Sequence, residues 1–196
     1  MKKQASPSAV RTWLSKPVIP VFWDAPPDES PLARASLLFL QGGELSELPD
    51  RLRQLRCGPA AHVPVVLHID LLAGLSSDEA GLRYLAGLGG IQGIITVRSH
   101  LVAPARRLGL ASILLLFLQD GRSVDRALHV IEQSRPDMVE LVPGVAALET
   151  ADQFQQVPVP RIAGGLIRTP ELVRRLLESG CAAVSSSNAR LWELNR

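Results

Sequence analysis

Short apolar segments recur along the chain and alternate with stretches in which hydrophobic residues lie three or four positions apart. The apolar segments consist mostly of Val, Ile, Leu and Ala, which is typical of parallel strands covered on both faces. We predict strands at residues 18–22, 35–40, 63–71, 93–98, 111–118, 137–142, 159–163 and 182–185. Helices are expected at 44–56, 77–88, 99–108, 123–134 and 145–154, and from Pro170, which follows the suitable N-cap residue Thr169.

Eight strands that alternate with helices fit either a closed barrel or a doubly wound open sheet. No glycine-rich fingerprint follows the first strand, whereas turns of small residues cluster after the seventh and eighth strands. We therefore predict a single-domain (β/α)8 TIM barrel over residues 18–196, preceded by a flexible N-terminal arm at 1–17. The chain has 196 residues. Since such barrels usually have at least about 200 residues, the loops must be short.

Two segments, RIAGGLIR (161–168) and CAAVSSSNAR (181–190), combine a buried strand with the start of a helix. Gly164 and Gly165 have no side chains, so their backbone amides can lie against a ligand. Ser185, Ser186 and Ser187 add hydroxyl groups, and Asn188 is a suitable N-cap for the helix that follows. A helix N-terminus binds anions. The segments therefore predict a phosphate site after strands seven and eight, where many barrels have one. The alternative is that they only form turns.

Polar residues near the ends of other strands extend this candidate site. His68 and Asp70 are two positions apart in the third predicted strand and would share a face, while Arg98 ends the fourth and Glu140 lies within the sixth. A carboxylate among apolar residues needs a partner, which Arg98, Arg168 or His68 could supply. These residues suit a small phosphorylated polyol, bound by an enzyme with Asp70 or Glu140 as general base or by a sensor without chemistry. They could instead form an ion-pair network that only specifies the barrel.

Charge and composition exclude several classes of protein. Net charge is +2, and the only lysines are Lys2, Lys3 and Lys16, so a Schiff-base lysine inside the barrel is excluded. Cys57 and Cys181 lack the spacing of a metal site, and no metal or other cofactor is expected. The first residues lack the apolar segment of a signal peptide, and no segment approaches the roughly 20 apolar residues of a membrane span. We expect a cytoplasmic protein without disulfides or membrane contact.

Several long motifs, in order and well spaced between Pro64 and Trp192, resemble the glycerol-3-phosphate-responsive antiterminator family. They are HIDLLAGLSSDEAG (68–81), GIITVRSHLVAPARRLGL (93–110), PDMVELVPG (136–144), AGGLIRTPE (163–171) and SSSNARLW (185–192). The resemblance implies a (β/α)8 barrel that binds glycerol 3-phosphate as an effector. In the liganded form it would bind the leader of messenger RNAs for glycerol catabolism and prevent premature termination. It would not be an enzyme, and homo-oligomer formation stays open.

The resemblance also assigns roles to individual residues. The phosphate would be held by Gly164, Gly165, Ser186 and Ser187 with Arg168 nearby, and the glycerol end would be lined by His68, Asp70, Arg98 and Glu140. Candidate RNA-binding residues are the pairs Arg106–Arg107 and Arg174–Arg175 on two helices. The chain departs from the family at Trp23, where the first strand often ends in arginine, and at Leu114 and Leu115, where a Gln-Arg pair is frequent. These departures leave a degenerate paralogue without RNA binding as a further alternative, beside an acid–base isomerase or lyase.

Overall fold

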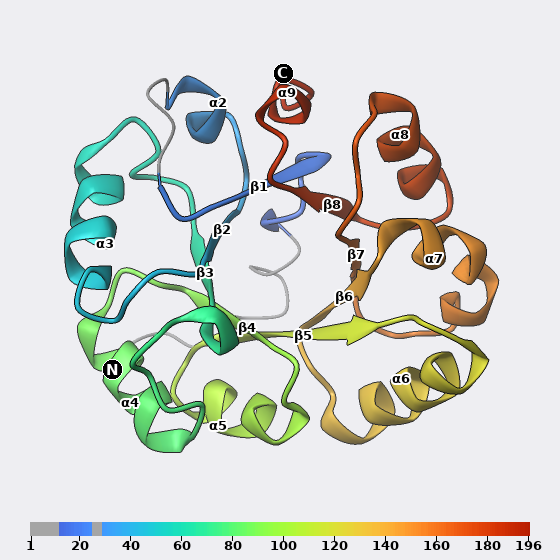
Figure 1. Cartoon of the computed structure of the whole chain (residues 1–196), viewed down its shortest axis with the longest axis horizontal. Helices are drawn as coiled ribbons and strands as arrows, with labels where there is room; N and C mark the ends of the chain where they lie inside the picture. The colour runs from blue at the N-terminus through green and yellow to red at the C-terminus, as the bar shows by residue number, and fades with distance from the viewer. Residues whose placement is uncertain (1–11, 25–28) are drawn as a thin grey trace.

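Eight parallel strands close into a barrel in which each strand pairs with its neighbours in sequence and β1 pairs with β8 (Figure 1). This computed structural model describes residues 12–24 and 29–196. The strands are β1 (Val18–Phe22), β2 (Leu38–Gln41), β3 (Val65–His68), β4 (Gly93–Thr96), β5 (Ala111–Phe117), β6 (Met138–Val142), β7 (Arg161–Ala163) and β8 (Ala183–Ser186). The predicted (β/α)8 barrel is confirmed.

Helices form the outer layer of the barrel (Figure 1). The α-helices are α2 (Ser30–Ala33), α3 (Leu48–Cys57), α4 (Glu79–Leu88), α5 (Val102–Arg107), α6 (Gly121–Ser134), α7 (Gly144–Glu149), α8 (Pro170–Glu178) and α9 (Ala189–Trp192). Short 3-10 turns lie at η1 (Ile69–Leu71), η2 (Ser99–Leu101) and η3 (Ala151–Phe154). The Thr169 hydroxyl accepts from the Leu172 amide at 3.2 Å, which confirms the predicted N-cap of α8. No helix in the described part of the chain is long and apolar enough to cross a membrane.

Alternation along the strands divides the apolar residues into two layers. Leu114 is fully buried between the sheet and the helices, whereas Leu115 belongs to the cluster inside the barrel. The inner cluster also contains Phe39, Ile113 and Met138, so the barrel interior is a packed core. The layering follows from the sequence period of two, because neighbouring residues of a strand point to opposite faces.

The segment before β1 packs against the barrel where the structure describes it. Of the arm expected at 1–17, residues 1–11 lie outside the described residues. Trp13 and Leu14 pack against the inner cluster. The Ser36 hydroxyl donates to the Trp13 carbonyl at 2.7 Å and accepts from the Lys16 amide at 3.1 Å. Ser36 precedes β2, so this segment covers the end of the barrel where the strands begin.

A buried asparagine joins the C-terminal segment to the first strand. Asn195 is fully buried, and its side-chain amide donates to the Val18 carbonyl at 2.7 Å. Its side-chain oxygen accepts from the Val18 amide at 3.0 Å. The Asn195 side chain thus satisfies both backbone groups of the residue that begins β1, next to the seam between β1 and β8.

Two predicted strands end earlier than expected. β3 ends at His68 and β4 at Thr96, and the chain turns into η1 and towards η2. The prediction that His68 and Asp70 share a strand face is therefore wrong, because Asp70 lies in η1. The Asp70 carboxylate accepts from the Val97 amide at 2.7 Å, an arrangement that joins the two loops. Both side chains nevertheless reach the same cavity.

Candidate functional site

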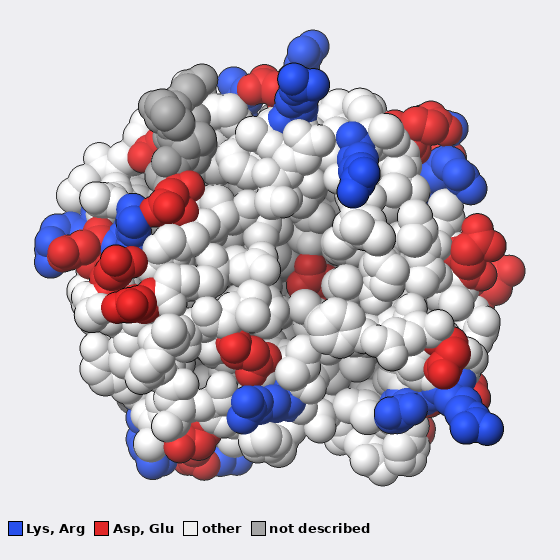
Figure 2. Space-filling model, viewed as in Figure 1, with Lys and Arg blue, Asp and Glu red and all other residues white. Residues whose placement is uncertain are grey.

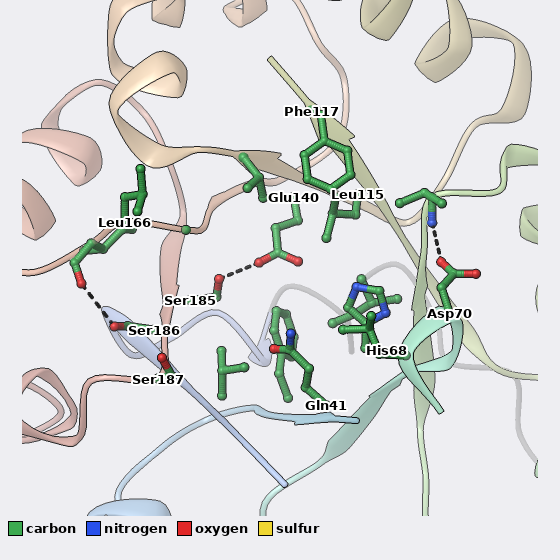
Figure 3. A pocket seen from close by; sticks show the side chains of 18 of the residues that line it. Gln41, His68, Asp70, Leu115, Phe117, Glu140, Leu166, Ser185, Ser186 and Ser187 are labelled. Carbon is green, nitrogen blue, oxygen red and sulfur yellow. Dashed lines mark hydrogen bonds between the residues drawn. The ribbon is translucent and has the colours of Figure 1, made fainter. Parts of the chain in front are cut away.

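The barrel opens, at the carboxyl ends of its strands, into a cavity of about 710 Å³. Figure 2 shows a hollow in the centre of this face, walled mostly by uncharged residues and with an acidic side chain at its floor. Of the predicted ligand-binding residues, those that line the cavity are His68, Asp70, Glu140, Gly165, Arg168, Ser186 and Ser187. Gly164 and Arg98 do not line it. The structure thus gathers most of the predicted site, and strand ends from both halves of the chain contribute to it (Figure 3).

The two predicted glycines differ in what their backbone can offer a ligand. The Gly164 amide donates to the Leu141 carbonyl at 3.0 Å, so it continues the sheet and is not open to a ligand. A Cβ at Gly164 would overlap the Glu140 carboxylate and the Ser185 hydroxyl. Gly164 is therefore required for close approach between side chains, and the expectation that its amide faces a ligand is corrected.

The loops after β7 and β8 each contain an amide that makes no backbone hydrogen bond to another described residue. Gly165 has a φ of +72° and Leu166 a φ of +58°, and the Gly165 carbonyl accepts from the Gly144 amide at 3.0 Å. Within residues 12–24 and 29–196, no backbone hydrogen bond uses the amide of Gly165 or of Ser187. Leu166 is 62% exposed, and a leucine in the left-handed region is a local strain of the kind found at ligand sites.

Ser186 supports the geometry of the β8 loop. Its hydroxyl donates to the Ile167 carbonyl at 3.4 Å and accepts from the Asn188 amide at 3.1 Å. The Asn188 side chain accepts from the Arg190 amide at 3.2 Å and thereby caps α9, as predicted. Ser187 and Arg168 are exposed at the cavity wall. The rim after β7 and β8 therefore combines open amides, a free-standing hydroxyl and a guanidinium group.

Glu140 lies at the floor of the cavity on β6 and is 5% exposed. The Ser185 hydroxyl from β8 donates to its carboxylate (Figure 3). Burial raises the pKa of Glu140 to about 7, and the Ser185 hydrogen bond opposes this rise. The prediction that Arg98, Arg168 or His68 pairs with this carboxylate is wrong for Glu140, because its hydrogen-bond partner is a serine.

Asp70 has the cationic partner that the sequence predicted. Arg98 Nε lies 3.3 Å from one carboxylate oxygen, and the Thr96 hydroxyl donates to the same oxygen at 3.2 Å. The Val97 amide donates to the other oxygen at 2.7 Å. Arg98 is half exposed and acts on the cavity through Asp70, because it does not line the wall itself.

His68 is 8% exposed and turns its imidazole towards the cavity (Figure 3). Its Nδ1 is buried and has no hydrogen-bond partner among the described residues. Desolvation lowers the pKa of His68, and the negative charge of Asp70 partly offsets this shift. The imidazole therefore borders the cavity in its neutral form, while its unused Nδ1 is turned away from the open space.

Sequence analysis missed Gln41 and Thr96, and it named Ser185 only as part of the serine run, without its role. Ser185 holds Glu140, Gln41 at the end of β2 lines the cavity, and the fully buried Thr96 donates to Asp70. The period of two from Ala183, which faces the barrel interior, would have placed Ser185 on the same face. Gln41 and Thr96 are the last residues of their strands, and strand ends are the least certain part of a sequence prediction.

The candidate RNA-binding arginines do not form one surface. Arg106 and Arg107 lie on α5 and Arg174 and Arg175 on α8, and Figure 1 places these helices on separate sides of the barrel. Arg106 donates to the Arg135 carbonyl.

Acidic side chains accompany these helices. Arg107 pairs with Glu79 at 3.0 Å, and Arg174 pairs with Glu171 at 2.6 Å and Glu178 at 2.5 Å. On the face shown in Figure 2, basic side chains are scattered around the edge among acidic ones. No single basic patch marks this face.

The three departures from the resembled family occupy different environments. Trp23 does not line the cavity; its ring lies against Gly43, and the Arg51 guanidinium lies 5.8 Å from the ring centroid. Leu114 is buried in the outer layer between sheet and helices and does not line the cavity. Leu115 lines the cavity beside Glu140. Only Leu115 therefore changes the chemistry of the cavity wall.

The closed (β/α)8 barrel places this chain in the large class of TIM barrels, and its cavity lies at the end of the barrel where such folds have their ligand sites. Within that class, the chain belongs to the family described as "Glycerol-3-phosphate responsive antiterminator", which matches residues 28–192.

Two similar solved structures and one sequence relative accompany this assignment. The glycerol uptake operon antiterminator regulatory protein from Listeria monocytogenes is 27% identical, with a TM-score of 0.78 over 91% of this chain and 96% of that one. A glycerol uptake operon antiterminator-related protein from Thermotoga maritima is 28% identical, with a TM-score of 0.79 over 91% of this chain and 98% of that one. The uncharacterized protein YgcP of Escherichia coli K12 is 31% identical over 128 residues, 65% of this chain and 67% of YgcP.

Proposed function

We propose that this protein is a cytoplasmic regulator that binds glycerol 3-phosphate as an effector, binds the leader of messenger RNAs for glycerol catabolism, and prevents premature termination. Membership of the antiterminator family supports the regulatory role. The observation that carries the ligand part is that Gly165 and Ser187, whose amides make no backbone hydrogen bond among the described residues, both line the cavity. Backbone amides at neighbouring barrel loops are the usual way such folds hold a phosphate.

The cavity supports one orientation of the ligand. The phosphate lies at the rim after β7 and β8, where the amides and the Arg168 guanidinium supply positive charge. The glycerol hydroxyls point towards the floor, where the His68 imidazole lines the wall and Glu140 presents its remaining carboxyl oxygen. The two ends of the cavity thus match the two ends of the ligand in hydrogen-bonding capacity.

The partners of the two carboxylates bear on the enzyme alternative. An acid–base isomerase or lyase would use Asp70 or Glu140 as its base. Asp70 accepts hydrogen bonds from the Val97 amide and the Thr96 hydroxyl and pairs with Arg98. Glu140 is held by Ser185. Asp70 is therefore committed to partners within the protein, whereas the raised pKa of Glu140 is compatible with a base, so family membership carries the preference for a sensor.

Isothermal titration calorimetry with glycerol 3-phosphate tests the ligand part. We expect saturable binding that Gly165→Asp weakens at least about tenfold, because a carboxylate there repels the phosphate and occupies its place. Gly87→Ala is the matched control, since a Cβ at Gly87 meets nothing within 4 Å and the residue lies on α4 away from the cavity. Absence of affinity for glycerol 3-phosphate and for every other phosphorylated triose or polyol would overturn the proposal.

Filter binding with leader RNA, with and without glycerol 3-phosphate, tests the regulatory part. We expect RNA retention that increases when the ligand is present. Arg107→Ala and Arg175→Ala distinguish the two helices: the one in contact with phosphates reduces the slope of affinity against salt by about one. Turnover of the ligand that is lost in Glu140→Gln while binding is kept would favour the enzyme alternative instead.

A further inference from the structure

One wall of the cavity is apolar from its mouth to its interior. Leu115 and Phe117 are two positions apart on β5, so their side chains lie on the same face of the strand. Leu115 is 9% exposed and lies inside, whereas Phe117 is 54% exposed at the mouth. Figure 3 shows the two side chains next to one another, above the Glu140 carboxylate. Together they form a continuous apolar strip that leads from solvent to the cavity floor.

The mouth of the cavity gathers exposed apolar side chains from the carboxyl-terminal ends of four strands and the turns that follow them. Leu71, Val97, Phe117 and Leu166 are each between 44% and 62% exposed, and all four line this cavity. Few other large apolar side chains are as exposed in the described part of the chain. An exposed apolar cluster around a cavity indicates that something apolar covers it.

The cavity is larger than the proposed polyol phosphate needs. Its volume of about 710 Å³ lies in the range of sites for drug-sized ligands, roughly 300 to 1,000 Å³. Glycerol 3-phosphate is a much smaller molecule, and its polar groups are matched by the β7 and β8 rim, His68 and Glu140. The strip formed by Leu115 and Phe117 would stay in contact with water if this ligand were the whole occupant.

We propose that, besides glycerol 3-phosphate itself, the site accepts a polyol phosphate monoester that carries a hydrocarbon chain, such as an acylated glycerol phosphate, with the chain along Leu115 and Phe117. This inference rests on the proposed function, because the phosphate occupies the same rim. The strip continues to Leu115 inside the cavity, a depth that a flexible chain can follow and a flat protein surface cannot reach. A chain of moderate length covers the apolar strip while the phosphate keeps its contacts with Gly165 and Ser187.

Calorimetry with four probes tests this inference: glycerol 3-phosphate, 1-hexanoyl-glycerol 3-phosphate, hexyl phosphate and hexanol, all below their micelle-forming concentrations. We expect the hexanoyl ester to bind at least about tenfold tighter than glycerol 3-phosphate, since each buried methylene contributes roughly a fourfold gain. Hexanol, which lacks the phosphate, should bind far more weakly than hexyl phosphate. That ordering would show that the chain and the phosphate act at one site.

Variants show whether the chain lies on the proposed wall. Phe117→Ser and Leu115→Gln should each remove most of the gain that the hexanoyl chain provides. Tyr84→Ser is the matched control: Tyr84 is 48% exposed on α4, outside the cavity, and the gain should be unchanged.

Two failures are distinguishable. If glycerol 3-phosphate binds and the hexanoyl chain leaves its affinity unchanged or weaker, this inference is overturned and the proposed function stands. If none of the phosphates binds, the proposed function falls and this inference with it. A gain that survives both Phe117→Ser and Leu115→Gln would place the chain elsewhere and would also overturn the inference.

Discussion

Leu115 on β5 and Glu140 on β6 are direct register partners in the barrel sheet, and both side chains face the cavity. Because Glu140 lies next to a leucine, no neighbouring positive charge in the described part of the chain offsets the desolvation of its carboxylate. Ser185 supplies one hydrogen bond, and the pKa of Glu140 is still raised to about 7. The Glu140 carboxyl group at the cavity floor therefore changes charge near neutral pH.

Glu140 should make the stability of the fold depend on pH in a defined window. In the unfolded chain its pKa is about 4.5 and in the fold about 7, so folding favours the protonated form. Its contribution is fully present below pH 4.5 and is lost as pH rises to about 7, a change of about 3 kcal/mol in the free energy of unfolding. Glu140→Gln cannot titrate and should lack this decline. Urea unfolding at a series of pH values measures it.

The comparison of the two proteins isolates Glu140 from His68. Because the pKa of His68 is lowered, its contribution has the opposite sign and is lost as pH falls below 6.5. His68 is present in both proteins, so the difference between their curves removes its effect. Parallel curves between pH 4.5 and 7 would contradict the raised pKa of Glu140.

Leu115→Arg should lower the pKa of Glu140 and shrink that pH dependence. A guanidinium at position 115 can extend into the cavity and lie next to the carboxylate, which favours the charged form. Leu114→Arg is the contrasting variant, because Leu114 is fully buried in the outer layer and a charge there has no water or partner. We expect Leu114→Arg to destabilise the fold by at least about 3 kcal/mol. Equal stability of the two variants in urea would contradict the layering.

Gly164→Ala should disturb the cavity floor. A Cβ there overlaps both the Glu140 carboxylate and the Ser185 hydroxyl, so we expect a loss of about 1 to 3 kcal/mol in unfolding free energy and weaker glycerol 3-phosphate binding. Gly87→Ala adds a methyl group to open space on α4 and should instead stabilise by about 0.5 kcal/mol. Thermal unfolding and calorimetry measure both effects. An unchanged Gly164→Ala protein would show that Glu140 and Ser185 move aside freely.

The two partners of the Asp70–Arg98 ion pair should differ in importance. Asp70→Ala removes the acceptor of the Val97 amide and the Thr96 hydroxyl, at a cost of about 1 to 3 kcal/mol. Arg98→Ala removes a half-exposed cation and should cost less than about 1 kcal/mol. If urea unfolding gives the reverse order, the carboxylate does not organise the loops after β3 and β4.

The strand pattern was predictable because apolar strands with helical spacing between them leave few architectures. The strand at 18–22 has the bounds that the sequence predicted, and the predicted caps of α8 and α9 are confirmed. The carboxyl-terminal ends of β3 and β4 were less predictable. Asp70 leaves the strand because its carboxylate bonds to the Val97 amide of the next loop, a contact that depends on how β3 and β4 are aligned.

The site was predictable in its members and less so in their partners. The sequence predicted His68, Glu140 and Gly165 as site residues, and all three line the cavity. The partner of Glu140 was misjudged, because a cation is the usual partner of a buried carboxylate and Ser185 comes from a strand far along the chain. That the Gly164 amide is used by Leu141 depends on the alignment of β6 and β7.

The Asn195 side chain, bonded to both backbone groups of Val18, has a consequence for synthesis. Residues 18 and 195 lie at opposite ends of the described chain, so the seam between β1 and β8 cannot be sealed while the C-terminal segment is still inside the ribosome. Most of the nascent polypeptide is then outside the exit tunnel while β1 still lacks its β8 partner on one edge. Removal of Asn195 alone would leave the opening strand with two unsatisfied groups at its start.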